Sequence, residues 1–154
     1  MWSKPGPMLV PFRHIIDYDD TVGIDVDQSA ADVAIADIPC NGTILFTALM
    51  CTEAVTAATT APVFKFDIRP TAGSDTGRGD GDAGAITIPS GTAIGTVMYD
   101  EAAKGDQVTA GDQVVCQYAT AASGPSITGH VVPMLVIDPE WEMLANLSAF
   151  TETA

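Results

Sequence analysis

The alternation of apolar and polar residues along the chain predicts a protein built from short strands. The segment 63–69 reads VFKFDIR, so three apolar residues alternate with three charged ones, which is the period-two pattern of a strand with one buried face. The segment 113–119 (QVVCQYA) places Val114, Cys116 and Tyr118 on one face in the same way. The other alternating or apolar segments that we predict as strands are 22–27, 33–35, 85–88, 93–99 and 130–137.

Two of the predicted strands have features that the pattern alone leaves open. The segment 43–52 (TILFTALMCT) is almost entirely apolar, so it fits either a strand buried on both faces or a buried helix. The Asn41-Gly42 turn signal before it favours the strand. In 130–137, Pro133 has no backbone N–H to donate, so we expect the strand to be an edge there or to carry a bulge.

About eight strands separated by turns predict an all-β sandwich or barrel, and an eight-stranded jelly roll is the most natural closed form. Gly105-Asp106-Gln107-Val108 recurs six residues later as Gly111-Asp112-Gln113-Val114, which indicates two similar turns that each open into a strand. A short C-terminal helix is also expected. Asp138 would be its cap, Pro139 its first residue, and Trp141, Leu144 and Ala145 its buried stripe.

The length of 154 residues favours a single domain, which we place at residues 17–154. Residues 1–16 form a different segment, because Pro5, Pro7 and Pro11 oppose a helix or a central strand. We predict an extended N-terminal arm that binds a partner or a neighbouring subunit, although packing on its own domain explains the pattern equally well. The candidate partner-binding residues are Trp2, Met8, Leu9 and Phe12.

The formal net charge of −14 narrows the range of partners. A field of this sign repels phosphate, so we expect no nucleic-acid partner and no anionic membrane partner. The chain contains no apolar span of transmembrane length. The three cysteines have no short spacing typical of a metal or disulfide framework, so we expect them to be small buried residues.

No catalytic motif is visible around either histidine or around Ser90, so we predict no catalytic residues and no enzyme. The glycine-rich loop 71–84 holds the best candidate metal ligands, Asp75, Asp80 and Asp82. Carboxylates on a flexible loop suit calcium, which is the one candidate cofactor, but the full spacing of a helix–loop–helix calcium site is missing. A hydrated loop without metal remains the alternative. Arg78-Gly79-Asp80 spells a tripeptide read by adhesion receptors, and it is too short to carry a prediction.

Three segments resemble small jelly-roll decoration or cement proteins of tailed-bacteriophage capsids. They are ITIPSGTAIGTVMY (86–99), AGDQV (110–114) and GHVVPMLVIDPEW (129–141). The resemblance implies a virion structural protein, often trimeric, that is soluble before assembly, binds the major capsid protein or another shell protein, and is located on the capsid surface. The alternative is a receptor- or carbohydrate-binding adhesin module with calcium in its Asp-rich loop.

Overall fold

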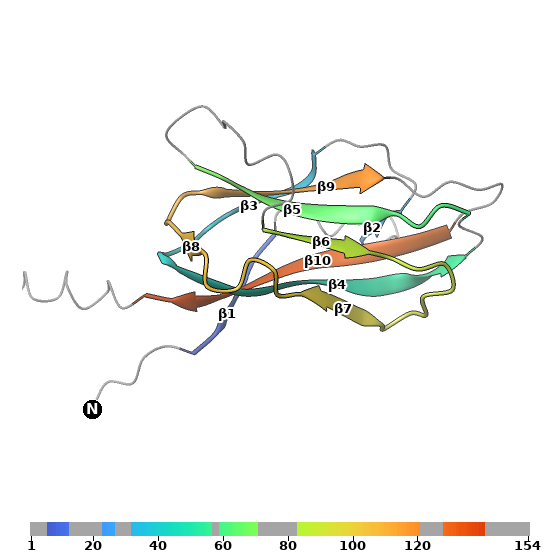
Figure 1. Ribbon diagram of the computed structural model, residues 1–154, viewed down its shortest axis with the longest axis horizontal. Helices are drawn as coiled ribbons and strands as arrows, with labels where there is room; N and C mark the ends of the chain where they lie inside the picture. Colours follow the sequence, from blue (N-terminus) through green and yellow to red (C-terminus); the bar gives the residue numbers. More distant parts are fainter. Residues whose placement is uncertain are drawn as a thin grey trace, which may run out of the picture.

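The computed structural model describes residues 6–12, 23–26, 32–56, 59–70, 83–120 and 128–140, with backbone alone at 32–35 and 120. Every regular element in these ranges is a strand, and the strands form two layers (Figure 1). The six-stranded sheet contains β1 (Met8–Val10), β2 (Ile24–Asp25), β4 (Gly42–Thr56), β7 (Val97–Asp100), β8 (Gln107–Val108) and β10 (Thr128–Pro139). The four-stranded sheet contains β3 (Asp32–Asp37), β5 (Val63–Arg69), β6 (Gly84–Thr87) and β9 (Gln113–Thr120).

The strand order confirms the predicted jelly-roll-like sandwich. The sheets run β1-β10-β4-β7 and β3-β9-β5-β6, with β2 paired to β10 and β8 paired to β4, and all these pairs are antiparallel. The chain changes sheet between β2 and β3, β3 and β4, β4 and β5, β6 and β7, β8 and β9, and β9 and β10. Each sheet therefore interleaves early and late strands, which is the arrangement of a jelly roll. Segment 43–52 is a strand, as predicted, and it belongs to the longer β4, which already begins at Gly42 without a positive φ there.

The core between the sheets is apolar and is centred on three aromatic rings. Phe64 and Phe66 of β5 and Tyr118 of β9 are fully buried. The ring of Phe64 lies 4.8 Å from that of Tyr118 and 5.5 Å from that of Phe66, both in edge-on geometry. The Tyr118 hydroxyl donates to the carbonyl of Ile24 at 3.5 Å, so this side chain joins the four-stranded sheet to β2 of the other sheet.

Four tight turns repeat one motif along one side of the sandwich. Each has a glycine at its third position with φ between 81° and 95°, and the next residue, Thr or Asp, donates its N–H to the carbonyl of the first residue. A positive φ at this position is the geometry of a type II turn. The turns are 89–92, 93–96, 103–106 and 109–112, and they form paired backbone hydrogen bonds with Val55, Cys51, Ile44 and Ile38. Because the last two turns lead into β8 and β9, the repeated Gly-Asp-Gln-Val phrase does mark two equivalent turns.

Two sequence predictions need correction. The segment 93–99 becomes a strand only at Val97, because Gly95 bends residues 93–96 into a turn. Pro139 does not begin a helix: it is the last residue of β10 and pairs with Gly42, and the N–H of Glu140 still donates to Asn41 of the neighbouring chain segment. The rest of the predicted helix, with Trp141, Leu144 and Ala145, lies outside the described residues.

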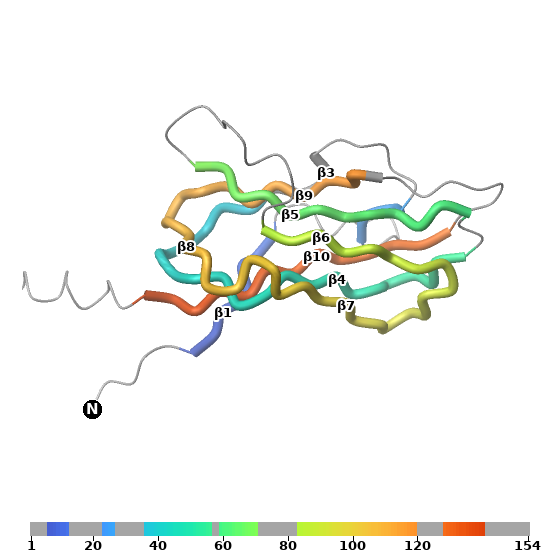
Figure 2. The backbone as a smooth tube through the Cα atoms, in the orientation of Figure 1, coloured from blue at the N-terminus to red at the C-terminus, as the bar shows by residue number. Residues whose placement is uncertain are grey.

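The strand β10 organises the six-stranded sheet, and Figure 2 shows it running beside β4 along the length of the sandwich. On its other side, β2 pairs with His130 and Val131, whereas β1 pairs with residues 135–137. Neither of these two pairings reaches Pro133, so no described strand pairing on this side of β10 needs the N–H that Pro133 lacks. The strand is thus a local edge at Pro133, as its sequence predicts.

Candidate interaction surface

Part of the candidate partner-binding set lies on the domain itself. Met8 and Phe12 are partly buried and pack against the core, while Leu9 between them is 55% exposed. The segment Met8–Val10 is an edge strand of the six-stranded sheet, and Val10 is fully buried. Trp2 lies outside the described residues, as do the candidate metal ligands Asp75, Asp80 and Asp82.

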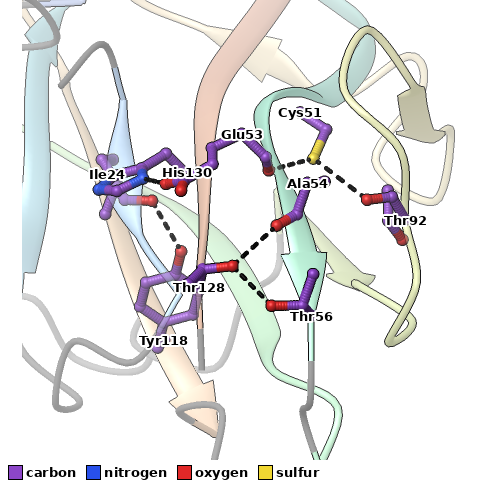
Figure 3. Close-up of polar contacts among 9 residues, drawn as sticks. All are labelled: Ile24, Cys51, Glu53, Ala54, Thr56, Thr92, Tyr118, Thr128 and His130. Carbon is purple, nitrogen blue, oxygen red and sulfur yellow. Dashed lines mark hydrogen bonds and ion pairs between the residues drawn. The ribbon is translucent and has the colours of Figure 1, made fainter. Parts of the chain in front are cut away.

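The described residues contain no group of three or more His, Cys, Asp or Glu side chains that could hold a metal ion. No helix in the described part of the chain is long and apolar enough to cross a membrane. One histidine–carboxylate pair is present at the end of the sandwich, where Nδ1 of His130 on β10 contacts Oε2 of Glu53 on β4 (Figure 3). Beside it, the hydroxyls of Thr56 and Thr128 lie 2.6 Å apart.

The thiol nearest to this pair along the chain is not set up as a nucleophile. Cys51 is buried, and its sulfur donates to the backbone carbonyl of Glu53 at 2.9 Å and points toward that of Thr92 at 3.9 Å (Figure 3). Burial raises the pKa of the Cys51 thiol, and it also raises the pKa of Cys40. Both thiols therefore stay protonated at neutral pH, whereas a catalytic cysteine needs its thiolate.

The two outer faces of the sandwich differ in chemistry. On the four-stranded sheet, the outward positions of β5 are Lys65, Asp67 and Arg69, which alternate with its three core residues. The Arg69 Nε lies 3.5 Å from the Asp67 carboxylate. Their register partners on β9 are Gln117, Val115 and Gln113. Charged side chains therefore occupy this face, but its centre is closed to water, because Asp67 and Val115 are 0% and 1% exposed.

The outer face of the six-stranded sheet is apolar instead. Residues directly opposite one another in antiparallel strands share a face, so the pairings define three cross-strand rows. The rows are Leu9–Val136–Phe46, Met134–Ala48–Tyr99 and Val132–Met50–Val97. We call these nine residues the apolar face; none of them is charged, and none carries a polar group other than the Tyr99 hydroxyl.

The exposure of the apolar face is greatest at its two edge strands. Leu9 on β1 is 55% exposed, and Val97 and Tyr99 on β7 are 53% and 68% exposed. The residues of the central strands β4 and β10 are half-buried, apart from the fully buried Ala48. Polar or charged side chains lie at the ends of the central strands, with Glu53 and His130 at one end and Asp138 at the other. The result is an uncharged centre with a polar rim, which is the anatomy of a protein–protein interface.

The sequence contained a signal for this surface that the strand predictions did not use. Both 43–52 and 130–137 are apolar on both faces, which we interpreted for the first segment as burial on both sides. The structure pairs these two strands with each other, so their second apolar faces lie side by side. Only the pairing, which local pattern does not specify, turns two apolar strands into one surface.

In comparisons with protein families, with curated proteins and with solved structures, no match to this chain was found.

Proposed function

We propose that this chain is a non-enzymatic structural subunit of a virion shell, of the decoration or cement class, which binds the shell and stabilises it. The observation that carries the proposal is the contrast between the two outer faces of the sandwich. One face carries charged side chains, while the other presents the uncharged apolar face. Monomeric proteins rarely leave an apolar patch of this kind uncovered, so the chain is built to work in a protein assembly.

Three further features support a virion protein over other kinds of assembly. The jelly-roll strand order occurs widely in viral capsid domains, although it also occurs in lectin domains. The three segments that resemble phage decoration proteins, 86–99, 110–114 and 129–141, fall largely on β6, β7, β10 and the glycine turns of one sandwich. The net charge of −14 makes a direct role in holding nucleic acid unfavourable and leaves a protein shell as the partner.

The decisive experiment compares virus particles with and without this chain. We expect particles from a deletion mutant to assemble but to release their genome at a lower temperature, since a cement subunit adds contacts between shell proteins. Adding back the purified chain should restore the release temperature. An antibody against the chain should then bind to the outer surface of the shell. If the wild-type particles lack the chain, or if the deletion leaves the release temperature unchanged, the proposal is wrong.

The alternative function, an adhesin with calcium in the Asp-rich loop, predicts a different effect of calcium on the melting temperature. Under the structural proposal, the melting temperature is expected to be the same in millimolar calcium and in EDTA, because that proposal assigns no metal to the loop. Circular dichroism melts of the full chain measure this directly. A melting temperature that rises with calcium, and that Asp80→Asn and Asp82→Asn together make insensitive to calcium, would favour the adhesin instead.

A further inference from the structure

The packing of β4 on β10 requires a glycine directly after Asn41. Gly42 lies against the backbone of β10, where an added Cβ would be 2.6 Å from the carbonyl oxygen of Asp138 and 3.2 Å from Cα of Pro139. These neighbours are backbone atoms of the same sheet, so any other residue at position 42 would push the two strands apart. The close pairing of β4 with β10 therefore imposes the dipeptide Asn-Gly at the start of β4.

Asn41 itself joins three segments of the chain at this end of the six-stranded sheet. Its side-chain Oδ1 accepts a hydrogen bond from the N–H of Ala110 at 2.8 Å, and its backbone carbonyl accepts one from the N–H of Glu140, also at 2.8 Å. Ala110 is the second residue of the tight turn 109–112, and Glu140 directly follows the last residue of β10. A turn thus holds the side chain of Asn41, while the end of β10 holds its main chain.

An asparagine that precedes glycine can react with its own backbone in water. The backbone nitrogen of Gly42 attacks Cγ of Asn41, so an N–Cγ bond forms, the Cγ–Nδ2 bond breaks, and ammonia leaves with the proton of the Gly42 N–H. Water then opens the five-membered succinimide at one of its two carbonyls, which gives aspartate or isoaspartate at position 41. Glycine favours the first step because it has no side chain to obstruct the attack.

We propose that Asn41 is a deamidation site and that the folded sandwich protects it. The attack requires the side chain of Asn41 to turn toward the backbone nitrogen of Gly42. The N–H of Ala110 instead holds Oδ1 of Asn41, and pairing with β10 and β8 holds the backbone of Gly42 on both sides. Reaction therefore waits for a local opening at this end of the sheet. The fold thus demands a reactive dipeptide for its strand packing and suppresses the reaction by its contacts.

The isoaspartate product does not fit the place that Asn41 occupies. Its main chain runs through the former side chain and gains a methylene, so Gly42 has to shift, although the backbone of β10 lies directly against it. We expect the refolded isoaspartate form to melt about 4 °C or more below the unmodified chain, a loss typical of one or two hydrogen bonds in a domain of this size. Asn41→Asp keeps the backbone and an acceptor oxygen, so it should melt close to the wild type. Equal melting of the isoaspartate form would contradict the close fit of Gly42.

The main test follows deamidation of Asn41 in the purified full-length chain by peptide mass mapping during incubation at neutral pH. We expect the rate in native buffer to be at least about tenfold lower than in denaturing urea, because the native chain has to open first. Ala110→Pro removes only the N–H that holds Oδ1, since proline suits the second position of a turn whose third residue is glycine. It should raise the native rate about fivefold, the factor that corresponds to one hydrogen bond.

The matched control is Ser90→Pro. Ser90 is exposed and occupies the second position of the equivalent turn 89–92, so this variant introduces the same residue away from Asn41 and should leave the native rate unchanged. Equal rates in native buffer and in urea overturn the proposal, as does an absence of deamidation in urea. A native rate that Ala110→Pro fails to raise, or that Ser90→Pro raises equally, overturns it as well.

Discussion

Replacing Phe64 with alanine is expected to lower the free energy of unfolding by about 3–5 kcal/mol, the range for removing a large buried aromatic side chain. Phe64 is fully buried and its ring contacts both other rings of the aromatic cluster, so the substitution loses apolar burial and two edge-on ring contacts. The neighbouring backbones of β6 and β9 hold the cavity open, because their hydrogen bonds to β5 fix the sheet on both sides of residue 64. Urea unfolding followed by circular dichroism measures the loss.

The control for this prediction is Ile94→Ala. Ile94 is also a large apolar residue, but it is 69% exposed at the tip of the 93–96 turn. Its replacement should change the unfolding free energy by less than about 0.5 kcal/mol, as expected for surface positions. For a protein with about 5–15 kcal/mol of stability in total, the Phe64 variant should lose a large fraction of it. A loss at Phe64 no greater than at Ile94 would show that the aromatic cluster is not the centre of the core.

The second large effect is expected at Gly129 in β10, where alanine should cost about 3 kcal/mol or more. The backbone there has φ of 144°, which residues with a Cβ rarely adopt. A Cβ would also lie 2.8 Å from Cγ2 and 3.0 Å from Cα of Val55, and 3.2 Å from Cγ2 of Val26. Both valines are fully buried, so the strands have to separate to make room.

Gly91→Ala separates the cost of the backbone conformation from the cost of steric crowding. Gly91 has a φ of 85°, but no atom lies within 4 Å of an added Cβ. This variant should lose only the conformational part, about 1–2 kcal/mol. Thermal and urea unfolding of the two variants side by side give the difference, which measures the crowding between β10, β4 and Val26. Similar losses of unfolding free energy in both variants would mean that β10 and β4 are not closely packed at Gly129.

Most of the fold was predictable from local pattern, since the strands of the core alternate with period two. Val63–Arg69 matched its predicted bounds, and Val114, Cys116 and Tyr118 all point into the core. Segment 93–99 was placed too early because a single glycine changes the backbone from strand to turn while the apolar pattern continues. The error at Pro139 has a different origin: Asp-Pro-Glu is a local signal for a helix start, but pairing with Gly42 extends the strand.

The candidate site was less predictable than the fold, for a physical reason. Motif searches look for several titratable groups that are close in sequence, and the apolar face has only the phenol of Tyr99. Its nine residues come from four strands, and Leu9 lies 127 positions before Val136, its partner in the same row. Such a surface depends on long-range pairing, and the sequence pattern gives the apolar residues without giving their neighbours.

The central place of β10 in the six-stranded sheet also sets the order in which the molecule is completed during synthesis. The strands β1, β2 and β4 all pair with β10, which comes near the end of the described chain. A nascent chain on the ribosome can therefore pair β9 with β3 and β5, and β4 with β7 and β8, but β1, β2 and the other edge of β4 wait for a partner that has not been translated. During this interval β4 exposes apolar side chains on both faces, so the sheet that carries the apolar face is the last to close and the most in need of protection from aggregation.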